Sequence, residues 1–127
     1  MLAAFRRRYG DEILETVEQT YYEMGTSEGL AEKEQYGSLL NKLVDIYVRP
    51  YSYENEQLEM TEERMCYQTL RCPFADMVMD MGLEELGKHL CPPWHKGYGE
   101  FYGYRWSGPK LLFDGDNCCY HIWEKAG

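Results

Sequence analysis

The fold class is decided near the C-terminal end of the chain by residues 104–124, YRWSGPKLLFDGDNCCYHIWE. The central residues 114–117, DGDN, are a strong turn signal, because Asp, Asn and Gly readily adopt the backbone angles that tight turns require. The flanking segments predict two strands, one over 104–113 with a break at Gly108-Pro109 and one over 118–124. We therefore expect a β-hairpin, whose two strands run antiparallel.

Upstream of the hairpin, the pattern predicts a further extended segment over residues 57–72, in which alternate side chains point to opposite faces. Two short helices are expected after it. The first covers 73–81 and has Pro73 at the favoured first helical position, and the second covers 83–90 and is closed by the CPP motif that follows it. Residues 94–106 are rich in glycine and aromatic side chains and predict no clear element.

The first part of the chain predicts two helices, because apolar residues recur at helical spacing over 4–24 and again over 28–47. The sequence Gly25-Thr26-Ser27 is expected to separate them, and Pro50 to end the second, since proline has no amide donor. Helices followed by strands, short helices and a hairpin predict an α+β fold. In this fold the N-terminal helices pack on a small antiparallel sheet of three or four strands, with short helices between strands.

Length and charge exclude several classes of function. The chain has 127 residues and a formal net charge of −9, so we expect one domain, 1–127, with a helical part (1–50) and a mixed part (51–127). A net negative chain argues against nucleic acid as a partner, because binding phosphates needs a basic surface. No apolar run approaches the roughly 18 residues of a membrane span. The first residues lack the order of a signal peptide, and five cysteines without such a signal predict free thiols and a cytoplasmic location.

Cys72 is the first candidate catalytic residue. It would be the N-cap of the helix that Pro73 begins, where unpaired amides and the helix dipole favour a thiolate and lower the pKa of the thiol. A thiolate is both a nucleophile and a metal ligand. The alternative interpretation is a buried cysteine that acts as a small hydrophobic side chain.

The last predicted strand supplies two more candidates, Cys119 and His121. Residues two apart on a strand share a face, so this pair could act as a thiol and its base, or bind one metal. Asp116, in the preceding turn, is a further candidate base, although turn chemistry alone also explains an aspartate there. The alternative for the strand is that one cysteine fills the core and His121 lies at the surface.

Cys91 completes a set of three thiols with Cys72 and Cys119, which are the candidate ligands of a zinc or iron ion. No Cys-x-x-Cys pair is present, so the strongest zinc signature is absent. The residues that follow are rich in aromatic side chains, which favours a planar or apolar small-molecule ligand. The candidate ligand-binding residues are Cys91, Trp94, Tyr98 and Tyr102.

Four motifs in the second half carry a resemblance to a known family. They are RCPFA at 71–75, MGLEELG at 81–87, LC at 90–91 and GDNCCYH at 115–121. In order and spacing, roughly over residues 58–124, the chain resembles the L-2-amino-thiazoline-4-carboxylic acid hydrolase-like proteins. By this resemblance, the positions that match the family's cysteines are Cys72, Cys91 and Cys119.

The resemblance implies a hydrolase that acts on a C–N or C–S bond of a small heterocyclic compound of the 2-aminothiazoline type. The ring carbon between sulfur and nitrogen is electrophilic, so a thiolate or an activated water can attack it, and donors must stabilise the intermediate. The sequence also departs from the family pattern. An acidic residue usually follows the middle cysteine within three positions, where this chain has Pro92-Pro93-Trp94, and Tyr120 stands in place of an aspartate.

These departures keep two other interpretations open. One is a non-catalytic sensor domain that binds a small molecule or a metal, with a layout similar to the vinyl-reductase-type ligand-binding domains. The other is an interaction protein whose aromatic residues form a homodimer interface. A flat exposed patch of Tyr98, Tyr102 and Tyr104 would favour the interface, and a closed pocket beside Cys72 would favour the enzyme or the sensor.

Overall fold

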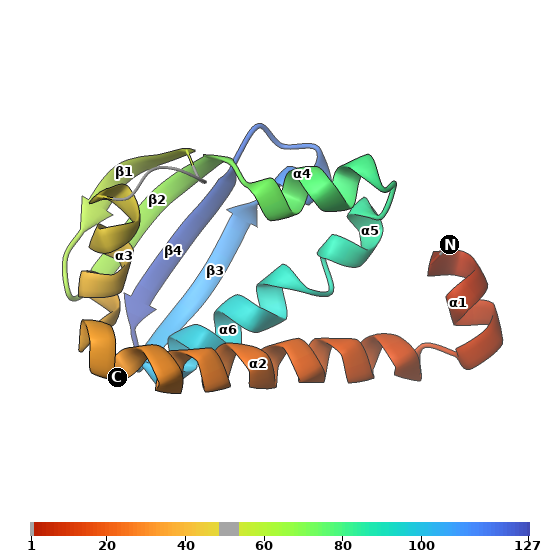
Figure 1. The fold of residues 1–127 in the computed structure, drawn as a ribbon, viewed down its shortest axis with the longest axis horizontal. Coiled ribbons are helices and arrows are strands. Elements are labelled where there is room, and N and C mark those ends of the chain that lie inside the picture. Colours follow the sequence, from red (N-terminus) through yellow and green to blue (C-terminus); the bar gives the residue numbers. More distant parts are fainter. Residues whose placement is uncertain (1, 49–53) are drawn as a thin grey trace.

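The α+β fold predicted from the sequence is confirmed by a computed structural model, which describes residues 2–48 and 54–127 (Figure 1). The helices and strands, in chain order, are α1 (Leu2–Tyr9), α2 (Glu12–Tyr36), α3 (Leu39–Val48), β1 (Glu54–Met60), β2 (Arg64–Arg71), α4 (Pro73–Asp80), α5 (Glu84–Gly87), α6 (Cys91–Phe101), β3 (Tyr104–Lys110), the short 3-10 helix η1 (Leu112–Asp114) and β4 (Cys119–Lys125).

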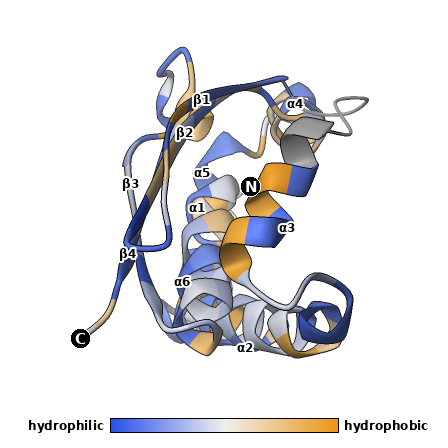
Figure 2. Ribbon diagram, turned by 90° about the vertical axis from the view of Figure 1, so that its left-hand side faces the viewer, coloured by the Kyte–Doolittle hydropathy of each residue, from blue (hydrophilic) through white to orange (hydrophobic). Residues whose placement is uncertain are grey.

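The strands form one antiparallel sheet of four in the order β1-β2-β4-β3, so the predicted hairpin of β3 and β4 is confirmed. Its first strand has a register shift between Ser107 and Lys110, where Gly108-Pro109 predicted a break. The helices lie on one side of the sheet, with α6 and α2 side by side (Figure 2). Among the described residues, no helix is both long and apolar enough to cross a membrane.

The main core lies between the sheet and the helices. A second, smaller cluster joins α4 to η1 through Ala75, Val78 and Phe113. In the main core the buried side chains come from α3, α6 and three strands. The helical layer and the sheet therefore pack on each other through this core. These side chains are Leu39, Leu43, Met65, Tyr67, Tyr98, Trp106 and Trp123.

The predicted helix break at Gly25-Thr26-Ser27 is wrong, because α2 continues through it to Tyr36. Gly25 is buried where α2 meets α6, and a Cβ added to it would lie 2.1 Å from the carbonyl oxygen of Trp94. The glycine therefore allows the two helices to touch. The breaks occur instead at Gly10 and Gly37, whose φ angles of 75° and 77° favour glycine.

Two further boundaries differ from the expectation. The extended segment over 57–72 is two strands, β1 and β2, joined by a turn in which the Thr61 hydroxyl accepts from the Arg64 backbone N–H at 3.1 Å. The motif Cys91-Pro92-Pro93 begins α6 rather than ending a helix, since the first helical turn needs no amide donors. The expected stop at Pro50 lies outside the described residues.

Candidate functional site

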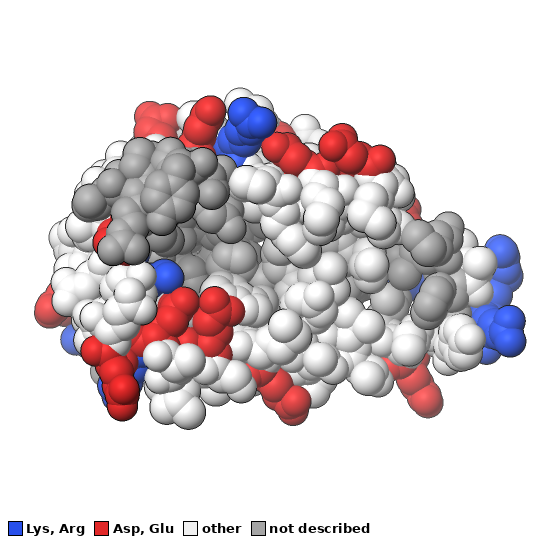
Figure 3. Space-filling model, viewed as in Figure 1, with Lys and Arg blue, Asp and Glu red and all other residues white. Residues whose placement is uncertain are grey.

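A cavity of about 600 Å³ lies between the helices and the inner face of the sheet. Its walls come from α2, α3, α4 and α6 and from all four strands. On the face seen in Figure 3, the molecule is hollowed near its centre, and acidic side chains lie along the lower edge of the hollow. A cavity of this size suits a small organic molecule.

The three predicted thiols meet at this cavity. Cys72 is the N-cap of α4, Cys91 is the first residue of α6 and Cys119 is the first residue of β4. All three side chains line the cavity. Burial, together with the nearby Cys72 and Cys119, raises the pKa of the Cys91 thiol to about 12. The fold therefore brings together thiols from three separate elements.

The prediction of a thiolate at Cys72 is wrong. The backbone amides of Phe74 and Ala75 do lower the pKa of this thiol, as expected at an N-cap, but burial has the larger effect and raises it overall. Burial likewise raises the pKa of Cys119, although the Leu112 backbone N–H donates to its sulfur at 3.3 Å. At neutral pH all three cavity thiols are therefore protonated.

The same three thiols were predicted as candidate metal ligands. In the part of the chain that the structure describes, no three or more His, Cys, Asp or Glu side chains are grouped as ligands of one metal ion. A zinc or iron ion at Cys72, Cys91 and Cys119 accordingly stays a prediction.

Two histidines, His95 and His121, line the same cavity. His121 lies on β4 with only 6% of its surface exposed, and its ring stacks on that of His95 from α6 at 4.9 Å between centroids. Trp106 donates its indole N–H to His121 Nδ1 at 3.0 Å. Burial lowers the pKa of His95 to about 4, and burial together with His95 lowers the pKa of His121.

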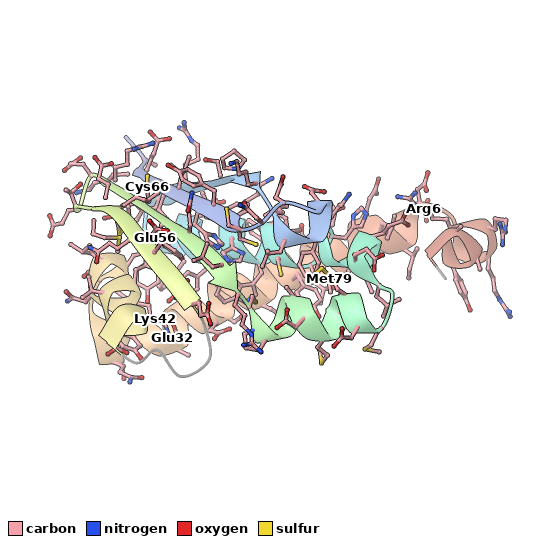
Figure 4. All side chains as sticks on the ribbon, turned by 90° about the horizontal axis from the view of Figure 1, so that it is seen from above. Arg6, Glu32, Lys42, Glu56, Cys66 and Met79 are labelled. Carbon is pink, nitrogen blue, oxygen red and sulfur yellow. The ribbon has the colours of Figure 1, made fainter. Side chains whose placement is uncertain are left out.

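Part of the cavity lining, from α2 and α3, is polar. Glu32 accepts hydrogen bonds from the Tyr98 hydroxyl at 2.5 Å and from Lys42 at 3.2 Å, and Figure 4 shows Glu32 and Lys42 beside each other. Glu28 lies one helical turn before Glu32, and burial and the nearby Glu32 raise its pKa. Trp94 stacks flat on Tyr98, with ring centroids 4.7 Å apart. This part of the lining thus presents two carboxyl groups beside an aromatic face.

Two predicted site residues lie elsewhere. Asp116 accepts a hydrogen bond from the Leu111 backbone N–H at 3.0 Å and does not line the cavity. Tyr102 donates to the Gly29 carbonyl at 3.1 Å and is also outside the cavity lining. The other predicted residues, Cys72, Cys91, Trp94, Tyr98, Cys119 and His121, do line it.

The sequence analysis did not select Glu28, Glu32, Lys42 or His95. His95 follows Cys91 by one helical turn, so a helix assigned over 91–101 would have placed the two together. Glu28, Glu32 and Lys42 are charged, and in the sequence alone such residues indicate a solvent-exposed helix face. Only the position of the sheet shows that they line a cavity.

The thiol environments predict an order of chemical modification. With iodoacetamide at pH 7.5, Cys72 should react faster than Cys91. Burial raises the pKa of both thiols, but two backbone amides lower the pKa of Cys72, whereas the neighbouring thiols raise that of Cys91 further. Peptide mapping by mass spectrometry after short exposures measures both rates. Equal rates, or a faster Cys91, would contradict the described thiol environments.

The comparisons with known proteins agree with the motifs. The family model described as L-2-amino-thiazoline-4-carboxylic acid hydrolase matches residues 1–123, which include every residue that lines the cavity. A search of curated proteins found no match. Because the family match covers nearly the whole chain, this protein belongs to the L-2-amino-thiazoline-4-carboxylic acid hydrolase family.

Proposed function

We propose that this protein hydrolyses a C–N or C–S bond in a small heterocycle of the 2-aminothiazoline type, bound in the central cavity. The observation that carries the proposal is the convergence of the three family cysteines, from positions 72, 91 and 119, on one cavity that also holds His121. Three separate elements, α4, α6 and β4, thereby place a thiol at the same cavity.

The polar part of the cavity lining supports a substrate with an amidine group. Lys42 and Tyr98 already donate to Glu32, so Glu28 is the carboxyl group that can accept hydrogen bonds from a ligand group rich in N–H donors. The flat face of Trp94 on Tyr98 offers a surface for a planar ring. The positions after Cys91 and Cys119 lack the acids usual in the family, whereas α2 brings two carboxyl groups to the same cavity.

The proposal is tested with 2-amino-thiazoline-4-carboxylate and a panel of related cyclic amidines. The wild-type protein should convert at least one of them to a ring-opened product that is one water heavier, as detected by liquid chromatography and mass spectrometry. Cys72→Phe, which fills one end of the cavity, should abolish turnover.

The matched control is Cys66→Ala, which removes a buried thiol that does not line the cavity and should leave turnover in place. Circular dichroism establishes that each variant is folded. Lack of turnover of the whole panel by folded wild-type protein would refute the proposed function, and ligand binding without turnover would point to a sensor.

A further inference from the structure

His95 and His121 lie side by side in the cavity wall, but their hydrogen-bond partners give them opposite chemical roles. Each ring has one nitrogen held by the protein and one without a partner among the described residues. Both rings line the cavity, which is where an unpartnered nitrogen can meet a ligand or a water molecule.

The tautomer of His95 is set by a backbone carbonyl. His95 Nδ1 lies 2.6 Å from the carbonyl oxygen of Cys91, one helical turn earlier on α6. A carbonyl oxygen can only accept, so Nδ1 carries the proton of the neutral ring. The lone pair is then on Nε2, so this nitrogen is the one through which His95 can act as a base.

The tautomer of His121 is set by an indole. Trp106 Nε1 can only donate, so His121 Nδ1 accepts and the proton of the neutral ring is on Nε2. Stacking on Tyr67 and on His95, at 4.8 and 4.9 Å between centroids, fixes the orientation of the ring. His121 therefore presents a hydrogen-bond donor.

We propose that His95 is the general base of the hydrolytic step, acting through Nε2 on a water molecule, and that His121 donates a hydrogen bond from Nε2 to the substrate. This inference rests on the proposed function. The cavity thiols are protonated at neutral pH, which favours an activated water over a thiolate as the nucleophile.

The step is balanced without any further reagent. As the water oxygen bonds to the ring carbon, His95 Nε2 takes one proton from the water, and the electron pair of the C=N bond moves to nitrogen, which accepts a hydrogen bond from His121. The electron pair on nitrogen then re-forms the C=N bond as the bond between that carbon and the ring sulfur breaks, and the sulfur takes the proton held by His95. One water is added, and His95 returns to its neutral form.

Both rings are neutral at pH 7, as these roles require. Among the described residues, the titratable group in contact with His95 is His121 on β4, and the same cavity holds Cys91, Glu28 and Glu32. Burial lowers the pKa of His95 to about 4, so the base is unprotonated over the whole neutral range.

The test is His95→Asn, in which the side-chain amide can still donate to the Cys91 carbonyl but no base remains at the position of Nε2. We expect kcat on the substrate found above to fall by about 100-fold or more, with KM little changed. Added imidazole should restore part of the rate in His95→Ala, which a purely structural role would not allow. The matched control is His89→Asn, because His89 pairs with Glu18 at 2.6 Å outside the cavity.

A second readout does not depend on turnover. The chain has 3 histidines, so the ¹⁵N shifts of a labelled sample resolve each ring, with His89→Asn providing one assignment. The expected result is an Nδ1–H tautomer for His95 and an Nε2–H tautomer for His121.

The outcomes separate the two proposals. If the wild type turns over its substrate and His95→Asn keeps kcat within about threefold, the base assignment is overturned and the proposed function stands. An Nε2–H tautomer for His95 also overturns the base assignment. If folded wild-type protein turns over nothing, the proposed function fails and the catalytic role of His95 fails with it.

Discussion

Acidification from pH 6.5 to pH 4 is expected to lower the free energy of unfolding by about 3 kcal/mol through His95 alone. The unfolded chain binds a proton on this imidazole below about pH 6.5. The folded protein does so only near pH 4, because burial lowers the pKa of the ring. Between these values the unfolded state binds more protons, so stability falls as the pH falls. His121 acts in the same direction.

Urea unfolding at half-unit steps between pH 7 and pH 4 measures this loss. His95→Phe keeps an aromatic ring in the stack with Trp106 and His121 but cannot bind a proton. Its stability should fall less steeply with pH than that of the wild type, by up to about 1.4 kcal/mol per pH unit. Parallel curves for the two proteins would show that His95 is not a buried neutral base.

Replacing Gly25 by alanine is expected to destabilise the protein by about 3 kcal/mol. Helix propensity alone predicts the opposite, a gain of up to about 1 kcal/mol, because alanine is the better helix former. The contact with α6 determines whether the substitution stabilises or destabilises the protein. The new Cβ would lie 2.1 Å from the Trp94 carbonyl oxygen and 2.9 Å from the Tyr98 backbone nitrogen, and backbone atoms cannot rotate away.

The measurement is chemical denaturation at neutral pH, with Ser27→Ala as the matched control. Ser27 is exposed on the same helix, so its replacement should change stability by less than about 0.5 kcal/mol. If Gly25→Ala were neutral or stabilising, the close crossing of α2 and α6 would not exist in solution. Since α6 carries Trp94, His95 and Tyr98, the same variant should also weaken any ligand binding in the cavity.

Local signals in the sequence were enough for the elements whose boundaries are set locally. The turn before β4 and the helix that Pro73 begins were predicted, since turn residues and an N-terminal proline act within a few positions. Two other positions were assigned wrongly. Gly25 resembles a helix breaker until α6 is known to lie against it, and Pro92-Pro93 resemble a stop until the chain is seen to continue as a helix.

In the site, too, some features follow from local sequence and others depend on the fold. Cys119 and His121 share a strand face, and alternation alone predicted that they point the same way. The protonation of the three thiols depends on how deeply the fold buries them, which no spacing reveals. The role of His95 depends on a backbone carbonyl and on a ring from β4. The carbonyl follows once 91–101 is assigned as a helix, but the ring partner cannot be assigned before the sheet is placed against α6.

The strand order has a consequence for how the chain is made. β4 lies between β2 and β3, yet it is the last of the four strands in the sequence. A chain that leaves the ribosome from its N-terminus can pair β1 with β2, but β3 has no neighbour until β4 follows. Both His121 and Cys119 arrive with that strand. The sheet and the cavity wall are therefore completed together, when β4 pairs with β2 and β3, and a nascent chain that ends before β4 has neither.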